Sequence, residues 1–221
     1  MIGIIGAMEE EVAALKSEMA DAKVTEFASM TFYKGTLCGK DTVVVRSGIG
    51  KVNAAICAQI LVDKFGVDTL INTGIAGSLD ARIDIGDMVI STDAVHHDMD
   101  ATIFGDAIGQ VPRMDTRTFP ADPHLVELAV KANEKANPQI HTFTGRVASG
   151  DQFISSGEVK ARIVENFQAL CTEMEGAGIA RLTLTKFRMS SFEQFLTKLT
   201  TVQRWTIQSL KNRQLPTAWR L

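Results

Sequence analysis

The sequence lacks the features that mark secreted, membrane-spanning and nucleic-acid-binding proteins. Its three cysteines, Cys38, Cys57 and Cys171, are far apart and form no CxxC pair, so they predict neither a disulfide framework nor a metal centre. No apolar run is long enough to span a bilayer, and no basic segment precedes the apolar residues 1–6, which argues against a signal peptide. The net charge of -3 disfavours nucleic acid and anionic membranes as partners. We therefore expect a cytoplasmic protein.

The C-terminal residues also lack what the rest of the chain contains. No glycine follows Gly178, and residues 181–221 hold eight Lys or Arg but a single acid, Glu193. This stretch therefore carries a net charge of +7, and residues 1–180 carry -10. Both tryptophans, Trp205 and Trp219, also lie in it. The break in composition at about residue 180 indicates either a separate module or an altered tail.

Before this break, apolar runs alternate with helical patterns. Strands are predicted at residues 2–7, 31–37, 42–46, 69–73 and 87–91, with a further strand ending at 147–149. Helices are predicted from residue 9 and over residues 51–65, 123–137 and 159–167. Small or polar residues follow most of the strands. This pattern predicts one α/β domain that binds its ligand at the carboxyl edge of the sheet.

Acidic residues stand at two predicted strand-to-helix junctions. The three glutamates 9–11 open the first helix, where acids are favoured by the helix dipole, and one of them facing inward would be a general base. Glu173 and Glu175 flank Met174 before the small residues 176–178. Because Glu is rarely buried without a partner, this second pair predicts a ligand site. A solvated capping turn is the alternative at this stage.

The remaining loops add groups that suit a nucleoside. Residues 47–50 are glycine-rich without forming a Walker loop, and Phe153 supplies a ring that can stack on a base. His96, His97 and Asp98 superficially resemble metal ligands, but adjacent side chains on a strand point apart and no further ligand set is evident. We therefore predict no metal. An acid to activate water, an acid to hold ribose hydroxyls and a stacking ring suit nucleoside hydrolysis.

Several motifs carry a resemblance to a known family, in the family's order along residues 1–180. They are GIIGAMEEE at 3–11, SGIGK at 47–51, NTGIAG at 72–77, SGDQFI at 149–154 and EMEG at 173–176. The sequence resembles the 5′-methylthioadenosine/S-adenosylhomocysteine nucleosidases. The resemblance implies the nucleoside phosphorylase-like α/β fold, with three layers and a mixed central sheet flanked by helices. It also implies a homodimer without a cofactor that releases adenine in methionine salvage and the methyl cycle.

The resemblance also implies a role for each matching site residue. Glu11 would be the base that activates water for attack at C1′, and Glu175 would bind the ribose hydroxyls. Carboxylates at these places would stabilise an oxocarbenium-like transition state. The other implied substrate-binding residues are Met174 beneath the sugar, Phe153 stacked on adenine, Ile154 at the base edge through its backbone, and Ile49, Ala76 and Gly77 along the pocket wall.

The chain departs from the family pattern after residue 180. The family continues with a buried strand ending in Arg-Ala-Ile-Ser-Asp, whose Asp is the general acid, and residues 181–200 contain no Ser-Asp. The coding DNA can be translated in a shifted frame whose first codon spans Lys186 and Phe187 and whose last spans Leu199 and Thr200. With allowed codon choices this frame encodes IPYVIIRAISDKAD. We therefore interpret residues 181–221 as an out-of-frame tail that replaces the last strand and helix. We expect a helix over residues 192–210 and weak activity at best.

Two other functions are compatible with parts of the pattern, and a third is disfavoured. A purine nucleoside phosphorylase of the same fold would need cations around a phosphate, for which Arg46 is one candidate. A non-catalytic remnant would bind nucleosides without cleaving them. A Rossmann dehydrogenase is disfavoured because Gly3 and Gly6 lack the three-glycine fingerprint. The sequence does not predict which of the two thio-nucleosides is preferred.

Overall fold

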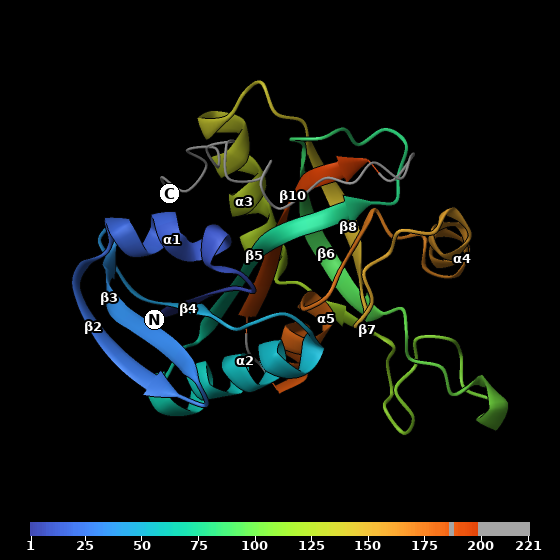
Figure 1. Cartoon of the computed structure of the whole chain (residues 1–221), viewed down its shortest axis with the longest axis horizontal. Coiled ribbons are helices and arrows are strands. Elements are labelled where there is room, and N and C mark those ends of the chain that lie inside the picture. Colours follow the sequence, from blue (N-terminus) through green and yellow to red (C-terminus); the bar gives the residue numbers. More distant parts are fainter. Residues whose placement is uncertain (186–187, 199–221) are drawn as a thin grey trace.

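The fold is an α/β arrangement around one mixed sheet, seen in a computed structural model that describes residues 1–185 and 188–198 (Figure 1). Within these residues the sheet has ten strands in the order β10-β6-β8-β9-β5-β1-β4-β3-β2, with β7 paired to β6. The strands are β1 Ile2–Gly6, β2 Ala20–Phe27, β3 Met30–Leu37, β4 Lys40–Arg46, β5 Thr69–Ser78, β6 Met88–His96, β7 Thr118–Pro120, β8 Thr142–Ser149, β9 Cys171–Glu173 and β10 Arg188–Lys198. The helices are α1 Glu9–Glu18, α2 Lys51–Phe65, α3 Pro123–Ala136, α4 Gly157–Phe167 and α5 Gly176–Ala180, with short 3-10 turns η1 Thr102–Phe104 and η2 Arg181–Thr185.

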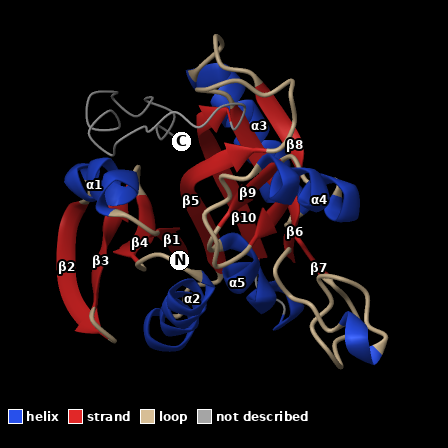
Figure 2. Ribbon diagram, turned by 45° about the vertical axis from the view of Figure 1, so that its right-hand side comes forward, coloured by secondary structure: helices blue, strands red, loops and turns tan. Residues whose placement is uncertain are grey.

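Strands β1 and β4 form the middle of three layers, with α1 on one face and α2 on the other (Figures 1 and 2). The alternation of side chains along a strand explains this packing. Ile4 contributes to the cluster that contains Leu15 of α1. The next residue, Ile5, contributes instead to the cluster that contains Leu61 of α2. The predicted three-layer α/β fold with a mixed sheet is confirmed.

The strands β5, β9, β8, β6 and β10 close on themselves, because β10 pairs with both β6 and β5. Strand β5 runs parallel to β1 and β10 and antiparallel to β9. Its final residues Gly77 and Ser78 pair with Thr172 and Cys171. The end of β5 therefore lies beside the strand that leads into Glu173, and two of the predicted site segments meet.

Most predicted elements form close to their predicted places, but β2 and β7 were not predicted, and two predicted strands are longer than expected. Nearly all side chains of β2 are exposed, and the strand is held by backbone pairing with β3. Strand β5 continues through residues 74–77, which were predicted as a loop. Strand β6 likewise runs to His96 rather than ending at residue 91. Hydrogen bonding to a neighbouring strand holds β2 without an apolar run and extends β5 and β6 beyond theirs.

The tail contains a strand where a helix was predicted. Residues 192–198 of the predicted helix belong to β10, so the helix prediction is wrong there, and residues 199–210 lie outside the described residues. Strand β10 pairs in parallel with β5 and antiparallel with β6, and Met189 is buried. Buried backbone N–H and C=O groups require hydrogen-bond partners. Pairing of β10 with β5 and β6 supplies these partners and outweighs the local helical pattern.

Candidate active site

Glu11 is the inward-facing acid of the first junction. Glu9 and Glu10 are exposed, whereas Glu11 is only 6 % exposed and accepts the Met8 backbone N–H at 2.9 Å. Burial raises the pKa of Glu11 to about 7, although hydrogen bonds with the backbones of Met8, Ala7 and Ile75 oppose the rise. Helix α1 comes close to β1 at Gly6, where a Cβ would lie 2.7 Å from Val12. The structure thus confirms that one glutamate of three faces inward.

Glu175 is the buried acid at the start of α5. It is 9 % exposed, and its Oε1 accepts the Gly50 backbone N–H at 2.7 Å. Burial raises its pKa to about 8, and the negative charges of Glu173 and Glu11 add to the rise. The Ile75 backbone hydrogen-bonds to Glu11, and Gly77, two residues further along β5, pairs with Thr172 just before Glu173, so both acids lie beside the end of β5. A solvated capping turn, the alternative considered from the sequence, does not fit this burial.

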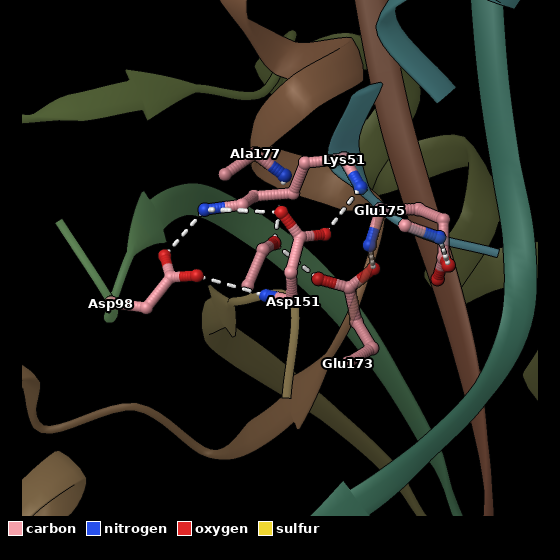
Figure 3. A network of polar contacts seen from close by, with 8 residues as sticks. Lys51, Asp98, Asp151, Glu173, Glu175 and Ala177 are labelled. Atoms are coloured by element: carbon pink, nitrogen blue, oxygen red, sulfur yellow. Dashed lines mark hydrogen bonds and ion pairs between the residues drawn. The ribbon is translucent and has the colours of Figure 1, made fainter. Parts of the chain in front are cut away.

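Glu173, the other acid of the pair that predicted a ligand site, is also buried. Its carboxylate accepts the backbone N–H groups of Glu175 at 2.7 Å and Gly176 at 2.6 Å, and the Ser149 hydroxyl (Figure 3). Ser149 Oγ in turn accepts the Ala177 N–H at 2.7 Å. Burial raises the pKa of Glu173. These contacts join β8, β9 and α5, so Glu173 holds the segment that presents Glu175.

The other predicted site residues surround these acids on four segments. Ala76 is buried near the end of β5, Gly77 follows it, and Met174 is partly buried between the two glutamates. Ile49 precedes Gly50 and is 53 % exposed. Phe153 is 79 % exposed, whereas Ile154 is buried and packs into the core.

A cluster of charged side chains connects the segments carrying Ile49 and Phe153. Lys51 Nζ forms an ion pair with Asp98, and the Lys51 N–H donates to Asp151 Oδ1 at 2.8 Å. The Asp151 N–H donates to Asp98 Oδ2 at 2.9 Å (Figure 3). Burial alone would raise the pKa of Asp98, but its hydrogen bonds to Lys51 and Asp151 lower it below the usual range. The sequence pattern alone indicates Asp98 only as a candidate metal ligand, not as a partner of Lys51.

The histidines and acids of residues 96–100 do not assemble a metal centre in the described part of the chain, which contains no group of three His, Cys, Asp or Glu suited to one. Asp98 faces Lys51, and Asp100 accepts the Thr102 hydroxyl at 2.7 Å. A cavity of about 260 Å³ beside them is lined in part by His97, Asp98 and Gln152. Neither Glu11 nor Glu175 lines this cavity.

Comparison with known proteins agrees with this geometry. The family model described as "Phosphorylase superfamily" matches residues 1–184. The 5′-methylthioadenosine/S-adenosylhomocysteine nucleosidase of Staphylococcus saprophyticus is 46 % identical over 183 residues, which are 82 % of this chain and 78 % of the relative. The chain belongs to this nucleosidase family. The nucleosidase of Staphylococcus aureus strain Newman is 39 % identical over 228 residues, covering 95 % of this chain and 98 % of the relative.

Solved structures of nucleosidases have the same fold. The Colwellia psychrerythraea nucleosidase, solved in complex with adenine, has a TM-score of 0.84 and 43 % identity over 88 % of this chain and 81 % of its own. The Neisseria meningitidis nucleosidase, solved with methylthio-immucillin-A, has a TM-score of 0.85 and 36 % identity over 90 % and 86 %. The predicted family and fold are therefore confirmed.

Three residues that hold the candidate site together were not predicted from the sequence. Lys51, Ser149 and Asp151 lie within motifs that carried the family resemblance, but their contacts with Asp98 and Glu173 depend on separate strand ends meeting. The available signal was position, since each follows or ends a strand at the carboxyl edge of the sheet. Residue type alone gave no indication of which partner each would find.

Proposed function

We propose that this chain hydrolyses the N-glycosidic bond of 5′-methylthioadenosine and S-adenosylhomocysteine, releasing adenine and the thio-substituted ribose. The observation that carries this proposal is the pair Glu11 and Glu175. Both are buried, both have a raised pKa, and their charges interact across two strand-to-helix junctions. Membership of the nucleosidase family supports the same reaction. The relatives are named for these substrates, and one was solved with adenine.

In the proposed reaction Glu11 accepts a proton from water as the water oxygen attacks C1′. A base whose pKa is about 7 is well matched to this task near neutral pH. The bond between C1′ and the adenine nitrogen breaks, and positive charge develops on the sugar ring. The neighbouring carboxylates stabilise that charge. The departing adenine takes a proton, which a general acid would supply.

The remaining residues hold the substrate in this proposal. Glu175 accepts hydrogen bonds from the ribose hydroxyls, and Met174 packs beneath the sugar. Phe153 stacks on adenine; its exposure leaves a ring face free for a ligand. The backbone of Ile154 reads the base edge, and Ile49, Ala76 and Gly77 line the pocket.

Adenine release from each thio-nucleoside by the purified protein tests the reaction, followed by liquid chromatography with and without phosphate. Hydrolysis predicts release that is independent of phosphate. A phosphorylase would require phosphate, but its candidate cation Arg46 is exposed and lies 4.0 Å from Glu9. Binding of the nucleoside without any adenine would instead identify a non-catalytic remnant.

We also propose that residues 181–221 are translated out of frame and that the general acid is thereby missing. In the alternative reading the Asp is encoded across Leu196 and Thr197. The register of β10 sets Thr197 opposite Gly77, at the predicted pocket wall, which supports the proposal. The match to the Staphylococcus aureus relative extends into the tail and favours the opposite view, in which the tail is read in frame.

Two experiments separate these views of the tail. Resequencing the DNA and mapping tryptic peptides establish the frame; an unbroken frame encoding the printed tail overturns the proposal. A version whose residues 187–200 read IPYVIIRAISDKAD should release adenine roughly 10² to 10⁴ times faster than the printed chain, which is the usual contribution of a general acid. Equal rates would show that the missing Asp is not needed.

The proposal extends to assembly and location. We propose a homodimer, supported by exposed apolar residues at and just before the start of α2, namely Ile49, Val52 and Ile56, and by the exposed Phe153. Light scattering of the purified protein would report one protomer mass if this is wrong. We also propose a cytoplasmic location, because the three cysteines are free thiols, and a role in methionine salvage, because the relatives are named for these thio-nucleosides. Fractionation of cells tests the location. The described part of the chain has no helix suited to crossing a bilayer.

A further inference from the structure

The N-terminus of α2 is held by two carboxylates that come from distant parts of the chain. The helix begins at Lys51 after Gly50, and its first turn contains no acid. The Gly50 N–H donates to Glu175 Oε1 at 2.7 Å, and the Lys51 N–H donates to Asp151 Oδ1 at 2.8 Å. The first N–H groups of a helix lack partners within it and carry partial positive charge. The start of α2 therefore binds both Glu175, the proposed ribose-binding residue, and Asp151, which begins the segment that carries Phe153.

The side chain of Lys51 reinforces this connection. Its Nζ forms an ion pair with Asp98 and lies 4.0 Å from Asp151 Oδ2. Asp98 also accepts the Asp151 backbone N–H at 2.9 Å, so Asp151 is held both by its backbone and by its carboxylate. The side chains of Lys51 and Asp98 are each only 14 % exposed. Figure 3 shows the three side chains converging from three segments.

Gly50 shows how closely these segments approach. Its φ of +101° lies in the region that favours glycine, and a Cβ there would stand 3.2 Å from Asp151 Oδ1. The carboxylate of Asp151 thus packs directly against the turn that presents the Gly50 N–H to Glu175. The position of residue 151 and the position of Glu175 are consequently set by adjacent backbone groups of one turn.

We propose that Lys51, Asp98 and Asp151 form a clamp that positions the adenine-binding segment 151–154 relative to Glu175. The segment is anchored at its far end by Ile154, which packs in the core, while Phe153 between the two anchors is 79 % exposed. The clamp supplies the second anchor. These three are positioning residues, since they act through Phe153 and Glu175. This inference depends on the proposed function, because it assumes that the segment binds adenine.

Three variants test the clamp. Lys51→Met removes the charge and keeps the alkyl chain and the backbone N–H, whereas Lys51→Arg keeps the charge. The matched control is Arg146→Met. Arg146 forms a comparably exposed ion pair with Asp93, between β8 and β6, and contacts none of the clamp residues or acids described above. Loss of a partly buried ion pair destabilises both Met variants, so stability alone cannot explain a difference between them.

Two measurements follow the segment itself. Adenine affinity is measured by isothermal titration calorimetry, and hydrogen exchange is measured for peptides covering residues 150–155. In Lys51→Met we expect roughly tenfold weaker adenine binding, or about 1.4 kcal/mol, together with faster exchange of the segment. The affinity falls because the binding-competent position is less populated. Lys51→Arg and Arg146→Met should bind adenine within about twofold of the unaltered chain.

The outcomes distinguish this inference from the proposed function. If the unaltered chain binds no adenine, the proposed function is wrong and the clamp inference fails with it. If the unaltered chain binds adenine and Lys51→Met binds it equally well, only the inference is overturned. The same holds if Arg146→Met weakens binding as much as Lys51→Met, because the effect is then general destabilisation. Unchanged exchange of residues 150–155 in Lys51→Met also overturns the clamp.

Discussion

The two strand-to-helix junctions of this protein use similar acids in different ways. After β1, Glu9 is exposed and pairs with Lys16 at 2.8 Å, while Glu11 turns inward. After β9, Glu173 and Glu175 are both buried. Each junction thus has one acid that supports the local structure and one that retains a raised pKa for chemistry. The supporting acid is a surface residue in the first junction and a core residue in the second.

This difference follows from what surrounds each helix start. Helix α1 begins at the surface, where an acid interacts with the helix dipole and with water. Helix α5 begins inside the molecule: Gly178 comes so close to α2 that a Cβ would lie 2.7 Å from the Lys51 carbonyl oxygen. Water cannot satisfy the first N–H groups of α5 there, so Glu173 accepts them. The supporting glutamate therefore contributes little to the structure at the first junction, where it is Glu9, and much at the second, where it is Glu173.

The largest expected effect comes from the inward acid of the first junction. Glu11→Gln should lower adenine release roughly 10³-fold, or about 4 kcal/mol in the barrier, because the base that activates water is lost. Single-turnover assays measure this in the printed chain and in the version whose residues 187–200 read IPYVIIRAISDKAD. Glu9→Gln is the matched control and should stay within about twofold. Equal losses in both variants would contradict the distinction between the two acids.

The next effect concerns the supporting acid of the second junction. Glu173→Ala leaves the Glu175 and Gly176 N–H groups and the Ser149 hydroxyl without their acceptor. Each buried donor left unsatisfied costs about 1–3 kcal/mol, so the free energy of unfolding should fall by about 3 kcal/mol or more. Urea unfolding measures it. Glu165→Ala, at an exposed position of α4, is the control, and a loss of similar size there would remove the contrast.

A smaller effect should be visible in the pH dependence of stability. Because the pKa of Glu175 is raised to about 8 in the folded state, the folded protein keeps a proton that the unfolded chain releases near pH 4.5. Its contribution is complete below that unfolded value and is lost as the pH rises towards about 8. Glu175→Gln should lose less stability between pH 5 and 8, by on the order of 1–3 kcal/mol. Parallel curves for Glu175→Gln and the unaltered chain would show that this pKa is ordinary.

The smallest effect is expected at the exposed acid of the first junction. Glu9→Gln breaks an ion pair whose Glu9 side chain is 51 % exposed, and such pairs contribute about 0–1 kcal/mol. The free energy of unfolding should change by less than about 0.5 kcal/mol, and the change should shrink further at high salt. Urea unfolding at two salt concentrations checks this. A loss approaching that of Glu173→Ala would mean that burial does not separate the two supporting acids.

Local sequence patterns predicted those elements whose own residues favour them. Helix α2 forms over the predicted residues, and the strands predicted at 31–37 and 42–46 appear as β3 and β4. Strand β2 escaped prediction because its exposed residues show no apolar period, and β10 because its pattern suggested a helix. Both strands are held by pairing with other strands: β2 pairs with β3, and β10 pairs with β5 and β6. Propensity cannot report such pairing, since it describes one segment at a time.

The sequence by itself determined which residue types follow each strand, and so the α/β class, the family and the order of the site segments. Only the tertiary structure decided that Glu11 rather than Glu9 is buried, that Glu173 holds the start of α5, and that Lys51 joins Asp98 and Asp151. The physical reason is that burial and hydrogen bonding depend on what lies nearby in space. Gly50 and Glu175 bond to each other across 125 positions of the chain, and no local pattern records that contact.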